Sequence, residues 1–192
     1  MTTKMYLERL LNDEVVLSEN VVQPVYQKVD FNIGEAIAFA DGSALNVLTK
    51  LARIAKFFEN HYAEKRNGFF VLFFRNRREK EQRFWKIFSV ELAKIRTKRM
   101  LMAMTKDGKL RVRRNNLDFN AEAAKEYYLS LSEEEKLLLF GNVSKKADNS
   151  FQLYQENRDN KEISSKDIDN YKSSALFWGD VRDLLSSIKI VA

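Results

Sequence analysis

The 192-residue chain contains no cysteine, one histidine and one proline. Without cysteine it forms no disulfide or thiolate metal site and has no thiol nucleophile, which suits a reducing cytoplasm. The single histidine, His61, excludes multi-histidine metal sites and proton relays. No apolar run reaches the roughly 20 residues that a membrane-spanning helix needs, and the first residues show no signal-peptide pattern. We therefore expect a cytoplasmic protein that does not enter membranes.

Recognisable catalytic motifs are also missing. The sequence has no Walker loop, no GxGxxG and no HExxH, and only six glycines in all. Glu79, Glu81 and Glu91 resemble a nuclease carboxylate cluster, but their irregular spacing among cations favours salt bridges. We expect no enzyme, no cofactor and no metal, with a divergent nuclease as the enzymatic alternative.

Basic charge is concentrated in one segment. A content of 45% hydrophobic and 31% charged residues is typical of a soluble globular protein. The net charge is +6, but residues 65–114 carry 17 basic and 4 acidic side chains, a local net charge of +13. Such a concentration predicts a surface that binds a polyanion.

The segment Arg99–Arg114 reads RMLMAMTKDGKLRVRR. Asp107-Gly108 between two alternating runs predicts a β-hairpin with a type I′ turn, in which glycine supplies the positive φ. One face of this hairpin is apolar, with Met100, Met102, Met104, Leu110 and Val112. The other face is cationic, with Arg99, Lys109, Arg111 and Arg113.

The neighbouring segments are interpreted as further strands. We expect strands over 69–76, 83–92, 98–105 and 109–117. A single long helix over Glu79–Met104 is the alternative, because Phe84, Ile87/Phe88, Glu91/Leu92 and Ile95 also fit a helical period. The hairpin motif favours the strands.

The first 65 residues predict short strands followed by one helix. Met5–Leu11 is either a helix or a strand, and Val15–Leu17, Val21–Val29 and Glu35–Phe39 are expected strands. Ser43 then caps a helix that runs to about Lys65, with an apolar residue every three or four positions.

The last 70 residues predict three helices. Asn120 caps a helix over 121–129, and a capping box at Ser132 opens a short helix over 133–140 that Gly141-Asn142 ends. Residues 142–162 are polar and are expected to form a mobile loop. A second capping box at Ser164 starts a final helix to about Lys189, whose apolar stripe suits a core or an oligomer interface.

This order of elements resembles the tandem ββββα repeat of the PUR and Whirly single-stranded nucleic-acid binders. The resemblance covers residues 1–130 and implies an α+β fold in which curved antiparallel sheets pack against helices. Residues 131–192 would then form a helical C-terminal extension packed on that domain, with homo-oligomers formed through the last helix. The lysine-, asparagine- and phenylalanine-rich composition is similar to that of RNA-binding proteins of large-genome phages, which implies the host cytoplasm.

We therefore expect a non-enzymatic binder of single-stranded RNA or DNA, RNA more than DNA. Cations would neutralise phosphates, and an exposed Trp85 would stack on bases. The expected contact residues are Arg75, Arg77, Arg78, Arg83, Trp85, Lys86, Arg96, Lys98, Arg99, Lys109, Arg111 and Arg113. The alternative function is a protein-interaction module, such as a phage-type inhibitor or adaptor, that docks an acidic partner.

Overall fold

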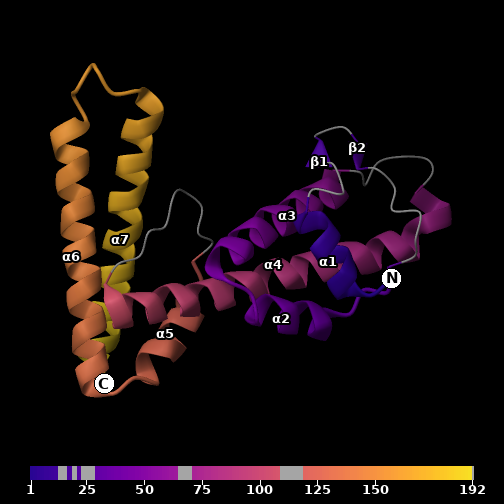
Figure 1. Ribbon diagram of the computed structural model, residues 1–192, viewed down its shortest axis with the longest axis horizontal. Helices are drawn as coiled ribbons and strands as arrows, with labels where there is room; N and C mark the ends of the chain where they lie inside the picture. Colours follow the sequence, from indigo (N-terminus) through magenta and orange to yellow (C-terminus); the bar gives the residue numbers. More distant parts are fainter. Residues whose placement is uncertain (13–16, 19–20, 23–28, 65–70, 109–118, 192) are drawn as a thin grey trace. The chain divides into compact units, whose positions relative to one another are not determined.

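The computed structural model describes residues 1–12, 17–18, 21–22, 29–64, 71–108 and 119–191 (Figure 1). The chain divides into two compact units, unit 1 (Met1–Arg96) and unit 2 (Thr97–Ala192). The elements of the described part are α1 (Thr3–Leu11), β1 (Leu17–Ser18), β2 (Val21–Val22), α2 (Ile33–Asp41), α3 (Leu45–Glu64), α4 (Val71–Asp107), α5 (Ala121–Leu129), α6 (Glu133–Asn157) and α7 (Ser165–Val191).

The expected α+β fold is wrong, and with it the resemblance to the sheet-based PUR and Whirly binders. Within the described ranges the one sheet is the two-residue antiparallel pair β1 and β2, with Leu17 opposite Val22. Helix α4 covers the strands expected at 69–76, 83–92 and 98–105 where these are described, so the alternative of one long helix is correct. The strand expected at 109–117 lies outside the described residues.

Unit 1 packs α1, α2 and α3 against the first part of α4. The Thr2 hydroxyl accepts a hydrogen bond from the Met5 amide at 3.3 Å and so caps α1, which buries Tyr6, Leu7 and Leu10. Glu35–Phe39, an expected strand, belongs to α2, because Asn32 caps that helix with its side chain. The core consists largely of apolar side chains from α1, α3 and α4, including Leu7, Leu10, Leu48, Leu51, Ala55, Phe58, Phe84, Trp85, Phe88 and Leu92.

The buried positions of α4 do not follow one helical period along its length. Among the described positions of unit 1 they are Phe84, Trp85, Phe88, Leu92, Ala93 and Arg96. Continuing that spacing by seven residues would bury Arg99, but Arg99 is exposed and Met100, Leu101, Met104 and Thr105 are buried instead. Burial instead recurs every four residues through Arg96 and Thr97, so the buried face winds gradually around α4 and the sequence shows no continuous amphipathic pattern.

Unit 2 contains an antiparallel pair of long helices, α6 and α7 (Figure 1). The Ser150 and Ser174 hydroxyls lie 3.3 Å apart, and Arg182 pairs with Asp148 at 3.3 Å, so residue numbers rise along one helix as they fall along the other. The prediction of the last helix is confirmed, because α7 buries a seam spaced by three and four residues: Trp178, Val181, Leu185 and Ile188.

Helix α6 is much longer than the sequence suggested. The expected stop at Gly141-Asn142 is wrong, and the loop expected over 142–162 is found only over 158–162, since the helix runs to Asn157. Val143, Ala147 and Ser150 are buried at intervals of four and three residues, so this polar segment still presents a seam to pack. A Cβ atom at Gly141 would have no neighbouring atom within 4 Å, so close packing does not require a glycine at this position.

Most of the predicted helix caps are confirmed. Asn120 accepts from the Ala123 amide at 2.8 Å, and Ser132 and Glu135 form both hydrogen bonds of a capping box. The backbone amide and hydroxyl of Ser132 lower the pKa of the Glu135 carboxyl. Ser164 accepts from the Asp167 amide at 3.2 Å. The predicted cap at Ser43 is wrong, because its hydroxyl donates to the Phe39 carbonyl at 2.7 Å.

Gly108 ends α4 with φ +59°, so the predicted positive φ is correct although it belongs to a helix end and not to a hairpin turn. The side-chain amide of Asn142 donates to the Met104 carbonyl at 2.7 Å and satisfies one of the last acceptors of α4. A Cβ atom at Gly108 would lie 2.9 Å from Asn142 Oδ1. The end of α4 therefore requires both a glycine and the Asn142 side chain.

Replacing Gly108 with alanine should lower the free energy of unfolding by about 1–2 kcal/mol, the usual cost of a left-handed backbone for a residue with a Cβ atom. The contact with Asn142 should add to this loss. Urea unfolding followed by circular dichroism measures the change. In an Asn142→Ala background the substitution should cost less, because the contact is gone. An unchanged stability in both backgrounds would contradict this account of the helix end.

Candidate interaction surface

Trp85 lies in the core of unit 1, so the expectation of an exposed ring that stacks on bases is wrong. Its side chain is 0% exposed and stacks on Phe58, with ring centroids 4.5 Å apart. Tyr6 and Phe31 contact it edge-on at 6.3 and 6.1 Å. The indole Nε1 finds no hydrogen-bond partner among the described residues. Trp85 therefore serves packing.

The other expected contact residues do not form one sheet face. Arg83 and Lys86 are exposed in unit 1, whereas Arg96 is only 3% exposed. In unit 2, Lys98 and Arg99 are exposed. Arg75, Arg77 and Arg78 belong to α4, but their side chains lie outside the described part, as do Lys109, Arg111 and Arg113.

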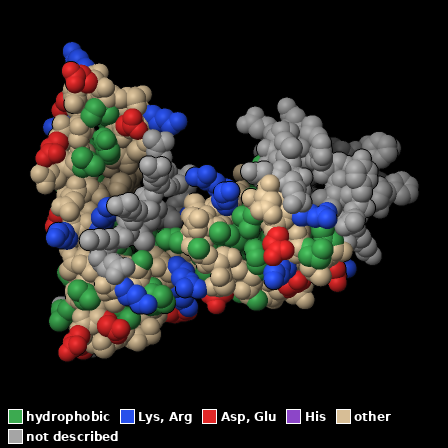
Figure 2. Space-filling view, viewed as in Figure 1, with side chains coloured by type: hydrophobic (Ala, Val, Ile, Leu, Met, Phe, Trp, Pro, Cys, Tyr) green, Lys and Arg blue, Asp and Glu red, His purple; other side chains and the backbone are tan. Residues whose placement is uncertain are grey.

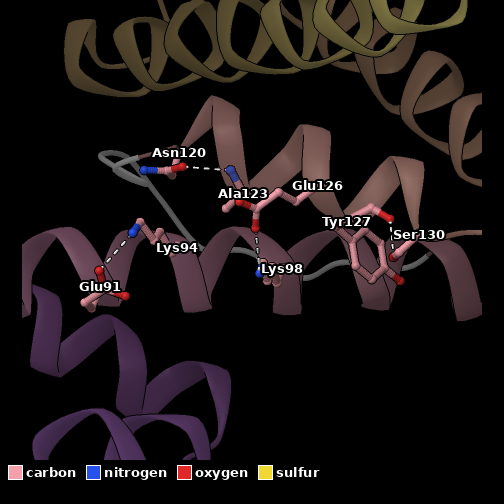
Figure 3. A network of polar contacts seen from close by, with 8 residues as sticks. All are labelled: Glu91, Lys94, Lys98, Asn120, Ala123, Glu126, Tyr127 and Ser130. Carbon is pink, nitrogen blue, oxygen red and sulfur yellow. Dashed lines mark hydrogen bonds and ion pairs between the residues drawn. The ribbon is translucent and has the colours of Figure 1, made fainter. Parts of the chain in front are cut away.

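Lys98 is held by an ion pair within unit 2. Its Nζ lies 3.1 Å from Glu126 Oε2, so a cation of α4 is matched by a carboxylate of α5 (Figure 3). The backbone N–H of Asn120 donates to the Thr97 hydroxyl at 3.0 Å, which fixes the start of α5 beside this pair. Both side chains of the pair are largely exposed, so the pair contributes little to stability.

The exposed side of α4 in unit 1 combines cations with aliphatic side chains. We define the α4 stripe as Lys80, Arg83, Lys86, Ile87 and Val90. A helix turns 100° per residue, and the burial of Phe84, Trp85 and Phe88 therefore leaves these positions outside. Ile87 is 38% exposed and Val90 is 47% exposed. Figure 2 shows one face of the molecule, on which basic, acidic and hydrophobic side chains are mixed.

The three cations of the α4 stripe are not neutralised by the described part of the chain. No described carboxylate lies within ion-pair distance of Lys80, Arg83 or Lys86. By contrast, Lys94 pairs with Glu91 at 2.9 Å, one turn along the same helix (Figure 3). The stripe therefore keeps positive charge available to a partner.

Sequence reasoning missed Ile87 and Val90 as surface residues. In a strand over 83–92, Phe84 and Phe88 share one face and Trp85 takes the other. In a helix Phe84, Trp85 and Phe88 share one face, which turns Ile87 and Val90 outward. The helical alternative counted Ile87 with Phe88 on its apolar period, and only the burial of Trp85 beside Phe84 and Phe88 shows that Ile87 faces outward.

Other chemistry in the described part is limited. Burial, with the neighbouring charge of Glu81, raises the pKa of the Tyr6 phenol, which stays protonated at neutral pH. The described residues contain no group of three histidine, aspartate or glutamate side chains placed to hold a metal ion. Among the described helices, none combines the length and apolar character that crossing a bilayer takes.

The α4 stripe is thus a helical surface with unpaired cations around two aliphatic side chains. Comparisons with family models, curated proteins and solved structures find no match to this chain.

Proposed function

We propose that this protein is a helical interaction module that docks an acidic partner protein through the α4 stripe. The observation that carries the proposal is the combination of three unpaired cations with two exposed aliphatic side chains on one helix face. Lys80, Arg83 and Lys86 supply the charge, and Ile87 and Val90 supply the apolar contact.

Each half of this surface has a physical role in docking. Exposed cations attract a negatively charged partner and help select it, although each contact is weak at physiological salt. Aliphatic side chains gain free energy when a partner's apolar side chain removes them from water. Ile87 and Val90 offer no flat aromatic face, so they suit a protein side chain better than a nucleobase.

Single-stranded RNA or DNA is the second candidate ligand. The unpaired Arg83 and Lys86 favour it, because cations of this kind contact phosphates without reading sequence. The buried Trp85 removes the stacking contact on which this function was expected to rely. Salt dependence does not separate the two candidates, because both bind through charge, so the test must compare ligands directly.

Replacing Arg83 and Lys86 together with glutamine should weaken binding of a 20-residue peptide of glutamate, leucine and alanine about three- to tenfold, as expected for the loss of two exposed charge contacts. Fluorescence anisotropy of the labelled peptide measures the affinity. The matched control is Lys50→Gln with Arg53→Gln, which removes the same two residue types from the exposed side of α3. That control should change the affinity less than twofold.

Two outcomes would contradict the proposal. Equal losses in both variants would show that the peptide responds only to net charge. Tighter binding of a 20-nucleotide oligouridine than of the peptide, at the same salt and with the same loss in the α4 variant, would assign the stripe to nucleic acid.

A further inference from the structure

We infer that the segment recognised by the α4 stripe is an acidic amphipathic α-helix that lies along α4. This inference rests on the proposed function and adds the structure that the partner segment must adopt. It follows from the backbone of the docking surface, from the spacing of its apolar side chains and from the position of its cations.

The backbone of the surface favours a helical partner over an extended one. The stripe lies within α4, whose N–H and C=O groups already bond within the helix, so it offers no sheet edge to which a strand could add. An extended peptide over Ile87 and Val90 would bury backbone groups against aliphatic carbon without hydrogen-bond partners. A helix satisfies its own backbone groups before it docks.

The apolar part of the stripe has the spacing of a helix seam. Ile87 and Val90 are three residues apart, about 4.5 Å along the axis of α4. Helices pack by placing side chains spaced by three and four residues between those of the neighbouring helix. A partner helix with leucines at that spacing could contact both side chains at once.

The cations set the charge pattern of that helix. Around the α4 axis, Lys86 lies on one side of the Ile87–Val90 pair and Lys80 on the other, and Arg83 precedes the pair on the same face. Glutamates that flank the leucines of the partner helix would therefore meet positive charge on both sides. From Lys80 to Val90 the stripe spans about 15 Å, which fits a partner helix of about three turns.

The test uses two peptides of the same glutamate, leucine and alanine content. In the first, leucines follow a spacing of three and four residues; in the second, the same residues are reordered so that no leucine face forms. The wild-type protein should bind the first peptide at least about tenfold more tightly. The circular dichroism of the first peptide should gain helical signal on binding.

A double variant tests whether the preference for the first peptide depends on Ile87 and Val90. Ile87→Gln with Val90→Gln removes the apolar pair and keeps good helix formers in α4. It should bind both peptides about equally. The matched control, Phe151→Gln with Leu153→Gln, removes two exposed apolar side chains from α6 of unit 2 and should keep the preference. Circular dichroism checks that each variant is folded. The comparison of the two peptides on the wild-type protein needs no variant and so does not depend on this check.

The outcomes separate this inference from the proposed function. Equal affinity of the wild type for both peptides, with a loss in the Arg83→Gln, Lys86→Gln variant, would overturn the helical partner and leave the acidic partner in place. A preference that persists in the Ile87→Gln, Val90→Gln variant would also overturn the inference. Binding of neither peptide would overturn the proposed function itself.

Discussion

Replacing Trp85 with alanine is expected to lower the free energy of unfolding by about 3–5 kcal/mol, the usual range for removing a large aromatic side chain from a core. The side chain is fully buried and is stacked on Phe58 at 4.5 Å. Its removal would leave a cavity between α1, α3 and α4 that these packed helices close only in part. The loss is comparable with the whole stability of many small domains, so unit 1 should lose its folded structure well before unit 2 does.

Urea unfolding followed by far-ultraviolet circular dichroism measures this effect. Ile87→Ala, only two residues along α4 but on its exposed side, is the matched control and should change stability by less than about 0.5 kcal/mol. If Trp85→Ala were as mild as the control, the ring would lie at the surface and stacking on bases would return as its role.

The local signals in the sequence were sufficient at the starts of α5, α6 and α7. The Asn120 cap predicted α5 at its observed bounds, and the capping boxes at Ser132 and Ser164 marked the starts of α6 and α7. These predictions succeed because a cap depends on hydrogen bonds between residues three positions apart, which the sequence shows directly.

Stop signals were less reliable, because packing can override them. Gly141-Asn142 was interpreted as a helix end, yet α6 continues through both residues. The Asn142 side chain is occupied with the Met104 carbonyl, a contact 38 residues away in sequence. The buried seam residues Val143 and Ala147 outweigh the weak helix preference of a single glycine. The residues that flank Gly141 and Asn142 in the sequence reveal neither the hydrogen bond to Met104 nor the burial of Val143 and Ala147.

The prediction of strands in place of the long helix α4 was wrong for a different reason. Asp107-Gly108 suits a type I′ turn and the end of a helix equally well, because both require positive φ at the glycine. The alternation Met100, Met102, Met104 resembled a strand. Burial every four residues makes the buried face wind around α4, so no continuous helical period in the sequence contradicted that strand.

The sequence likewise predicted some side chains of the candidate surface correctly and others wrongly. Arg83 and Lys86 are exposed, as most charged side chains are, but Arg96, another expected contact, is buried, so charge alone did not identify the surface cations. Trp85 was placed on the wrong face, because a strand and a helix over the same residues turn it in opposite directions. The ligand assigned to the surface changes with that single side chain.

Aspartate substitutions at Met102 and Met104 distinguish the helix α4 from the predicted hairpin, because in the helix the two substitutions should cost very different amounts of stability. Met104 is 0% exposed and Met102 is 36% exposed. Met104→Asp would place a carboxylate in a fully buried position and should cost more than about 3 kcal/mol. Met102→Asp places the charge in water and should cost less than about 1 kcal/mol.

Urea unfolding followed by the fluorescence of Trp178, in a Trp85→Phe background, measures both effects in unit 2. Trp178 is only 4% exposed, so its emission should report the loss of the α6–α7 seam. Met104→Leu is the control for the volume of the buried side chain and should cost less than about 1.5 kcal/mol. In a hairpin the two methionines share one face, so equal losses from Met102→Asp and Met104→Asp would contradict the helical register of α4.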